Sequence, residues 1–416
     1  MTVIPRIVRR GALVALSGFT LAGCSDFLTV TNPNVINASA IDPVTDAVTL
    51  AASAQQNFAV AHGWFAMYQS WMIGEALVAE TFPTRNEYGR REVLNTNGSH
   101  ASDVWQPISV ALSSASAVLN LTLPTPTTNI SYARAATFKG YSFVYMAESF
   151  CVGVSNGGGP LTTTQMLDSA IASFARAITV GSANATADGI QLANIARVGL
   201  ARAQLQAGRT EEAIAAARAV PAGFVFNIAT IDDPAQRTRL GNRLWQFTLD
   251  RGSITVAPAY RITGDPRIRF KTPAQHNLAP QDPASGAFFI QDKYPAFNTP
   301  IRLASKLEAD YIEAEASGTA AQLAFIAARR SANDQPAYTG PQEAADVLTE
   351  FLDQKGRDFY LEAKRMGDFR RRPMNMRNLP IPGAPYFKAG FAPIGNQTCW
   401  PLPLQETDNN LNFPRS

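Results

Sequence analysis

Few side chains of this 416-residue chain have the types and spacing that catalysis requires. The three histidines, His62, His100 and His276, stand far apart and form no pair at metal-ligand spacing. The sequence contains no nucleophile elbow, and the glycines at 157–159 lack the Gly-Lys-Ser/Thr that completes a phosphate-binding loop. These features predict a protein that is not an enzyme and that holds no metal or other cofactor.

Two charged clusters invite a chemical interpretation. The first is acidic and lies in a predicted helix, where its members spread around the surface and are expected to be solvated: Glu308, Asp310, Glu313 and Glu315. The second is the basic run at 370–372, whose charge Glu362 and Asp368 can largely neutralise. We therefore expect neither a catalytic carboxylate pair nor an anion site here.

Binding without catalysis remains, and sugar binding in particular uses aromatic faces together with planar polar groups. Both types occur in the loop regions 81–99 and 222–300. The ligand-binding candidates are Arg85, Tyr88, Arg90, Asn97, Trp105, Trp245, Tyr260 and Tyr294. Because aromatic residues dominate protein cores, each ring taken alone is more typical of a buried anchor than of a sugar platform.

The N-terminus predicts export and lipidation. Three arginines precede an apolar run at 11–23, which is shorter than the ~20 residues of a membrane-spanning helix, and no later run approaches that length. The run ends in Leu-Ala-Gly-Cys, the form of a bacterial lipobox, so residues 1–23 are expected to be cleaved and Cys24 to carry a lipid anchor. The alternative is an ordinary signal peptide followed by an incidental cysteine.

Composition and charge bound the remaining functions. Hydrophobic residues make up 46% and charged residues 17% of the chain, which is typical of a packed globular protein. Cleavage would remove three arginines and no acidic residue, so 33 of the 36 Lys and Arg would face 33 Asp and Glu. Such a balance argues against nucleic-acid binding. Of the other cysteines, Cys151 and Cys399 form either a disulfide or two unrelated buried thiols.

The elements that position these residues are mostly helical. Residues 24–42 are polar and predict a tether, and 222–300 is rich in proline and glycine, which predicts loops, short strands and small helices. Helical spacing of apolar residues predicts one or two helices over 46–79 and further helices over 133–150, 164–180, 303–316, 320–331 and 342–371.

One segment, Asn194 to Pro221, has the pattern of a tetratricopeptide helix pair. Ala201 and Ala213 are small where two helices would approach closely, and Gly208 falls where the chain would reverse. The aromatic residues of a full repeat are missing, so the unit is degenerate.

Two C-terminal motifs, with the lipobox and the helical order, resemble the SusD/RagB family. Residues 356–371 (GRDFYLEAKRMGDFRR) are similar to a family helix, with Arg357, Glu362, Arg365, Asp368 and Arg370 in register. Ala363 stands where the family usually has glycine. Residues 399–412 are similar to a near-terminal family segment, matching at Pro401, Pro403, Glu406, Asn410 and Asn412.

The resemblance implies a single, all-α dominated domain over 43–416. It would consist of about four tetratricopeptide-like helix pairs over about 46–221 and 303–331, an irregular lobe with short strands over 222–300, and the structural motifs within 342–416. It also implies an outer-membrane lipoprotein, expected at the cell surface, that passes a nutrient to a SusC-like TonB-dependent transporter. The ligand would be an oligosaccharide or, as in the RagB branch, a peptide.

Two alternatives from other classes remain. A periplasmic tetratricopeptide scaffold would bind proteins and no nutrient, although the long irregular segment argues against a continuous repeat. A hydrolase with a nonstandard site is the other. The sequence leaves open the identity of the ligand, the aromatic residues that contact it and the membrane face.

Overall fold

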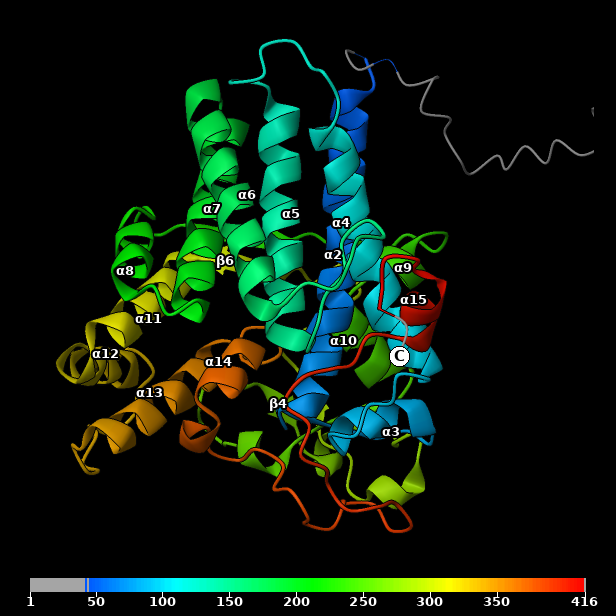
Figure 1. Ribbon diagram of the computed structural model, residues 1–416. Helices are drawn as coiled ribbons and strands as arrows, with labels where there is room; N and C mark the ends of the chain where they lie inside the picture. Colours follow the sequence, from blue (N-terminus) through cyan, green and yellow to red (C-terminus); the bar gives the residue numbers. More distant parts are fainter. Residues whose placement is uncertain (1–41, 43–44, 415–416) are drawn as a thin grey trace, which may run out of the picture. The chain divides into compact units, whose positions relative to one another are not determined.

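Long helices dominate the structure (Figure 1). The computed structural model describes residue 42 and residues 45–414; the predicted signal peptide, Cys24 and nearly all of the predicted tether lie outside this range. From Ala47 onward the described residues form one compact unit. The helices of its first half are α2 (Ala47–Met72), α3 (Pro83–Gly89), α4 (Gln106–Leu119), α5 (Ile130–Ser149), α6 (Thr163–Asn184), α7 (Ala187–Gln206) and α8 (Thr210–Arg218).

Helices resume after an irregular lobe. They are α11 (Lys306–Ser317), α12 (Thr319–Ser331), α13 (Ala344–Asp358), α14 (Met366–Arg371) and α15 (Leu404–Asn409). Neighbouring helices pack as pairs, α2 with α4, α5 with α6, α7 with α8, and α11 with α12. This arrangement confirms the predicted helical-repeat fold with about four helix pairs.

Local capping explains several helix starts. Thr162 and Gln165 form a reciprocal capping box at the start of α6, and Thr186 accepts a hydrogen bond from Gly189 at the start of α7. Between these helices Ala185 takes a left-handed conformation (φ 56°), which reverses the chain within two residues. In the degenerate repeat, Gly208 (φ 74°) forms the turn, and Ala201 and Ala213 are fully buried, as the sequence predicts.

Close packing across three helices depends on glycine. The ring of Phe174 in α6 is fully buried between Gly140 of α5 and Gly199 of α7. A Cβ on Gly140 would lie 2.6 Å from the ring, and one on Gly199 only 2.3 Å from it, closer than carbon atoms approach. The two glycines therefore set the spacing of these helices.

Strands of the lobe over 222–300 take part in three short antiparallel pairs. β1 (Ala76–Val78) pairs with β3 (Ile254–Val256), β2 (Val225–Ile228) with β6 (Ile301–Ser305), and β4 (Phe270–Lys271) with β5 (Ile290–Gln291). Its helical pieces are α9 (Arg237–Leu240), α10 (Arg243–Trp245), the π-helical η3 (Gln246–Asp250) and the 3-10 turns η4 (Pro258–Tyr260), η5 (Pro273–Gln275) and η6 (Pro283–Ser285). A second π-helical segment, η2 (His100–Trp105), precedes α4, and the 3-10 turn η7 (Pro373–Asn375) follows α14.

The structure corrects three predicted helices. The first predicted helix ends at Met72 instead of Ala79, since Gly74 (φ 73°) turns the chain into β1. The helix expected from Leu303 begins at Lys306, because residues 301–305 pair as β6 and the Ser305 side chain caps α11. The third is the continuous helix over 342–371, which is broken between Asp358 and Met366.

Left-handed backbone at Leu361 (φ 58°) and Ala363 (φ 55°) makes that break. The break lets Glu362 form ion pairs with Arg302 and Lys293, and it lets Lys364 form one with Glu308. These ion pairs to distant segments outweigh the helical periodicity of residues 359–365. Glycine adopts such a conformation without strain, which gives a physical reason for the glycine that the resembling motif has at the position of Ala363.

The C-terminal segment returns to the end of α5. Cys151 and Cys399 are joined by a disulfide bond, and the backbone N–H of Trp400 donates to the carbonyl oxygen of Ser149 at 2.7 Å. The indole of Trp400 is fully buried against Phe65, Tyr88 and Phe150. The final motif thus joins the main hydrophobic core.

Candidate ligand pockets

The structure places Tyr88, a predicted ligand residue of the loop 81–99, inside the fold. Tyr88 is fully buried, and its hydroxyl lies 2.5 Å from Nδ1 of His100, whose Nε2 contacts the carbonyl oxygen of Pro401 at 2.7 Å. A ring nitrogen that contacts a carbonyl must donate, so His100 is the neutral Nε2–H tautomer and accepts from Tyr88. Burial lowers the pKa of His100 to about 4, in agreement with this assignment.

The polar predicted ligand residues of the same loop, Arg85, Arg90 and Asn97, make contacts within the protein. Arg85 pairs with Glu80 at 3.1 Å and Asp103 at 3.3 Å, and Arg90 pairs with Glu92 at 2.6 Å. The amide of Asn97 donates to the backbone of Thr84 and to Glu87. These side chains hold the loop 81–99 in place.

The remaining aromatic candidates lie in separate parts of the unit. Trp105 donates to Glu406 at 3.2 Å, and Trp245 packs on Phe297 with ring centres 4.0 Å apart. Tyr260 stacks on Tyr360, and buried Tyr294 donates to the carbonyl oxygen of Leu361. The structure does not gather the eight candidates at one surface, and the packed rings serve as anchors between segments.

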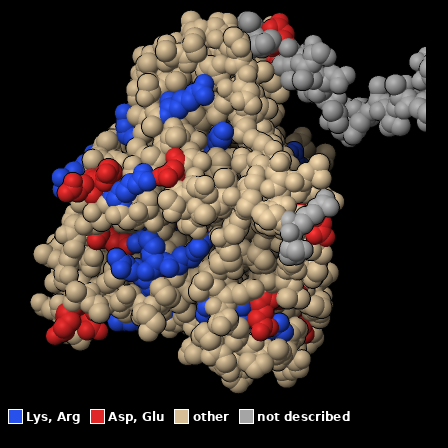
Figure 2. Space-filling model, in the orientation of Figure 1, with Lys and Arg blue, Asp and Glu red and all other residues tan. Residues whose placement is uncertain are grey.

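The charged residues of the first C-terminal motif also point inward. Asp368 accepts from Lys355 at 2.7 Å and Arg371 at 3.1 Å, and Arg370 donates to the carbonyl oxygens of Ala147 and Phe150. Arg365 donates to the hydroxyl of Tyr260. Figure 2 shows basic side chains gathered on one face over the region of α14, with acidic side chains beside them.

Two acidic residues expected to be solvated are buried instead. Glu308 pairs with Lys364 at 2.6 Å, and Glu315 pairs with Arg371 at 2.5 Å. Glu308 also faces Arg202, which forms a two-point ion pair with Glu148. The expectation was wrong because it treated α11 as a surface helix, whereas α7, α8, α12 and the broken motif pack around it.

A polar pocket of about 550 Å³ lies beside this motif, and we call it the motif pocket. Five basic residues and two carboxylates line it: Arg267, Arg269, Lys293, Arg302, Arg329, Asp358 and Glu362. Tyr294 is the one predicted aromatic candidate in its wall.

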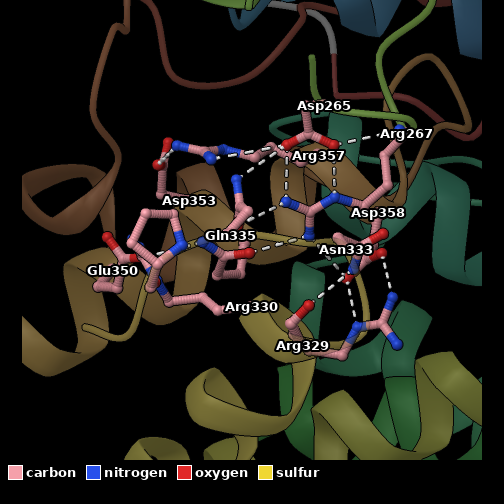
Figure 3. Close-up of polar contacts among 12 residues, drawn as sticks. Asp265, Arg267, Arg329, Arg330, Asn333, Gln335, Glu350, Asp353, Arg357 and Asp358 are labelled. Atoms are coloured by element: carbon pink, nitrogen blue, oxygen red, sulfur yellow. Dashed lines mark hydrogen bonds and ion pairs between the residues drawn. The ribbon is translucent and has the colours of Figure 1, made fainter.

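Internal ion pairs use most of the charge in the motif pocket (Figure 3). Arg267 lies between Asp265 at 2.7 Å and Asp358 at 3.4 Å, and Arg329 contacts Asp358 at 2.6 Å. On the other side, Lys293 and Arg302 contact Glu362 at 2.5 and 2.8 Å. Burial acts in the opposite direction, yet these two cations hold the pKa of Glu362 below its usual value.

A second pocket, of about 410 Å³, opens between helix α2, the first turn of α5 and the start of the lobe; we call it the α2 pocket. Its walls are a face of α2 (Ala52, Gln55, Gln56, Ala59, Val60 and Gly63), residues 228–231, residues 239–241, Arg134, Arg243 and Ile301. The α2 residues recur at three- and four-residue steps, which places them along one side of the helix.

The walls of the α2 pocket carry basic side chains. Three arginines line it, whereas none of its lining residues in the described part of the chain is acidic. The sequence does not single out these arginines, because Arg134 lies far from the other two in the chain and none of the three belongs to a recognisable motif. The spacing of Arg239 and Arg243, four residues apart, was the only local signal.

Over residues 42 and 45–414, no group of three His, Cys, Asp or Glu side chains has the geometry to hold a metal ion. The same residues include no helix that is long and apolar enough to span a bilayer.

Comparison with solved structures identifies the fold. The surface glycan-binding protein A of Bacteroides thetaiotaomicron is 12% identical and superposes with a TM-score of 0.65 over 89% of this chain and 98% of its own. A SusD superfamily protein of Bacteroides fragilis is 14% identical, with a TM-score of 0.64 over 90% of this chain and 100% of its own. A SusD/RagB family protein of Bacteroides thetaiotaomicron is 14% identical, with a TM-score of 0.58 over 80% of this chain and 89% of its own.

No family model and no curated protein matches the sequence. The superpositions nevertheless extend over most of the chain, so the protein has the SusD/RagB fold. The resemblance inferred from the sequence motifs is confirmed at the level of the fold.

Proposed function

We propose that this protein is a nutrient-binding lipoprotein of the SusD/RagB type. It captures an oligosaccharide at the cell surface and delivers it to a SusC-like TonB-dependent transporter of the outer membrane. The observation that carries the proposal is the fold, shared over nearly the whole chain with proteins that include a surface glycan-binding protein. Because one fold can serve several functions, the motifs of 356–371 and 399–412 are the second support.

The anchor is part of the same proposal. Lipidation of Cys24 would hold the protein at the membrane through its acyl chains, since the described residues include no membrane-spanning helix. We expect the wild-type protein in the outer-membrane fraction and a Cys24→Ala variant in the soluble fraction. Equal membrane attachment of the two would contradict a lipid anchor at Cys24.

Copurification tests the partner. Affinity-tagged protein, expressed in its own host and mildly cross-linked, should bring down a large β-barrel receptor from solubilised outer membranes. The Cys24→Ala variant serves as the matched control and should not. Capture of periplasmic proteins without any barrel would favour the scaffold alternative.

Titration calorimetry tests the ligand class. Binding of oligosaccharides without turnover supports the glycan proposal, and selective binding of peptides supports the RagB-like alternative. Turnover of a polysaccharide would instead reveal a hydrolase. The α2 pocket is large enough for either kind of ligand, since small-molecule sites begin at about 300 Å³.

A further inference from the structure

We propose that the α2 pocket takes up an aliphatic chain carried by the sugar ligand, as in an oligosaccharide that bears an acyl ester. This inference rests on the proposed function and specifies its substrate class. Its basis is the contrast between the two pockets. Ion-paired charged groups line much of the motif pocket, whereas aliphatic side chains predominate in the wall of the α2 pocket.

The aliphatic wall comes from several parts of the chain. The residues with purely aliphatic side chains that line the pocket are Ala52, Ala59, Val60, Ile228, Ala229, Ile231, Leu240 and Ile301. Ile228 and Ile301, which face each other in the β2–β6 pair, are buried and belong to the main hydrophobic core. The described lining residues include no aromatic ring. A pyranose ring would therefore find no stacking face here, whereas a hydrocarbon chain finds matching surface.

Arg243 contributes to this wall through its hydrocarbon stem. Its guanidinium lies 4.3 Å from the ring centre of Trp64 and donates to Gln246 at 2.9 Å, and neither of these residues lines the pocket. The stem lies against Gly63 of α2, where a Cβ would be 3.2 Å from the Cγ of Arg243 and 3.8 Å from its Cβ. Glycine weakens the interior of a helix, and at this position it makes room for the stem.

The other two arginines of the wall also have partners outside the pocket. Arg239 donates to Asn57 at 2.9 Å, and Arg134 pairs with Asp188 at 3.4 Å; neither partner is a lining residue. Long basic side chains can lay their stems along apolar surface while the charged head stays in water or on a partner. The arginines therefore add hydrocarbon to the wall, and the pocket is not an anion site.

The size of the pocket favours a chain over a single small group. Its volume of about 410 Å³ is more than twice that of an apolar cavity of ~150 Å³, which is sufficient to bind benzene. One leucine-sized group would leave much of this space to water, which gains little from aliphatic walls. A chain of several methylenes can displace that water, and each methylene that it buries strengthens binding.

Two amides of the pocket suit the sugar that carries the chain. Gln56 is exposed and Gln55 is half-buried, and neither side chain has a hydrogen-bond partner among the described residues. Amides offer both donors and acceptors, as sugar hydroxyls require. The pocket thus combines hydrocarbon surface with free, uncharged polar groups, and an amphiphilic sugar derivative combines the same two properties.

Alkyl glucosides of increasing chain length test the proposal by titration calorimetry. The probes are methyl, hexyl and octyl β-glucoside below their micelle concentrations. The protein is the whole chain in its Cys24→Ala form, which is expected to remain soluble without detergent. We expect affinity to rise about fourfold for each added methylene until the pocket is full, since a buried methylene contributes about that factor. The heat-capacity change of binding should become more negative along the series.

Pocket-filling variants locate the chain. Ala59→Phe, and Ala52→Phe at a more exposed position, each add a ring to the wall and should remove the effect of chain length. The control Ala172→Phe adds the same ring at an exposed position of α6, outside the pocket, and should change nothing. Thermal unfolding checks that each variant is folded. The proposal fails if chain length has no effect, or if it has the same effect in all three variants.

A peptide pair tests another carrier of the aliphatic group, with Ala-Ala-Ala and Ala-Leu-Ala compared as their amides. Preference for the leucine peptide, without any effect of chain length among the glucosides, would overturn the proposal in favour of a peptide side chain. Binding of unsubstituted oligosaccharides with no gain from an alkyl chain would also overturn it, while leaving the proposed function intact. If no sugar bound, with or without a chain, both proposals would fail.

Discussion

The carboxylate of Glu75 accepts a hydrogen bond from the backbone N–H of Leu361, 286 residues further along the chain, at a distance of 3.2 Å. Both residues are buried, and the other carboxylate oxygen of Glu75 has no hydrogen-bond partner among the described residues. Burial raises the pKa of Glu75 to about 7, although Arg365 acts in the opposite direction. The contact between α2's end and the broken motif is therefore sensitive to pH.

We predict that Glu75 makes the protein less stable as the pH rises. Its folded-state pKa of about 7 exceeds the unfolded value of 4.5, so its contribution is complete below about pH 4.5 and is lost as the pH rises through 7. Glu75→Gln keeps the acceptor without the charge and should raise the unfolding free energy by about 2 kcal/mol at pH 8 and little at pH 4. Urea unfolding at both pH values measures this. The exposed Glu212→Gln control should show no such dependence.

Ala363 provides a test of backbone strain. Its left-handed conformation suits glycine, so Ala363→Gly relieves strain worth about 1 kcal/mol while losing a buried methyl of similar value. We expect unchanged or slightly higher stability. The matched control is Ala213→Gly in α8, equally buried but helical, which should cost about 2 kcal/mol. Thermal unfolding measures the stability of both variants. Similar losses of stability in the two would contradict backbone strain at Ala363.

The buried pair of Glu308 and Lys364 should be strongly coupled. The charged atoms are 2.6 Å apart and both side chains are almost inaccessible, so removal of Lys364 leaves the buried Glu308 with only the more distant Arg202, at 3.5 Å, as a counter-ion. Lys364→Met alone should cost about 3–5 kcal/mol. The double variant Lys364→Met with Glu308→Leu should cost less than the two single losses combined. Additive losses in denaturant unfolding would argue against the coupling.

The glycine beside Phe174 should resist substitution. Gly199→Ala improves helix propensity by about 1 kcal/mol, yet its methyl would overlap the ring, so we expect a net loss of about 1–3 kcal/mol. Adding Phe174→Leu, which shortens the side chain, should recover part of the loss. If Gly199→Ala proved as stable as the wild type, the three helices would be less tightly packed than described.

Local sequence patterns predicted the parts of the fold that depend on local physics. The period of apolar residues located α5, α6, α12 and the turn at Gly208, because each helix buries one continuous face. The break after Asp358 could not be predicted in this way. It depends on Arg302, Lys293 and Glu308, which are distant in sequence and whose contacts exist only in the folded chain.

The candidate site was harder to predict for a related reason. Tyr88 and Tyr294 are of the residue type expected in a ligand platform. Residue type does not distinguish a platform from a buried anchor, and the structure shows both rings buried. Arg134, Arg239 and Arg243 meet only through the approach of α5 and the lobe to α2. Residues that come together only through tertiary packing leave no local pattern in a sequence.

The covalent link between Cys151 and Cys399 has a consequence for biosynthesis. The helices from α2 to α14 must all be synthesised before Cys399, so the bond can form only after nearly the whole chain has been made. A chain released early keeps a reduced Cys151 at an exposed position just beyond α5. Two such unfinished chains could then cross-link through this thiol, and dimers under non-reducing conditions would be the signature of interrupted synthesis.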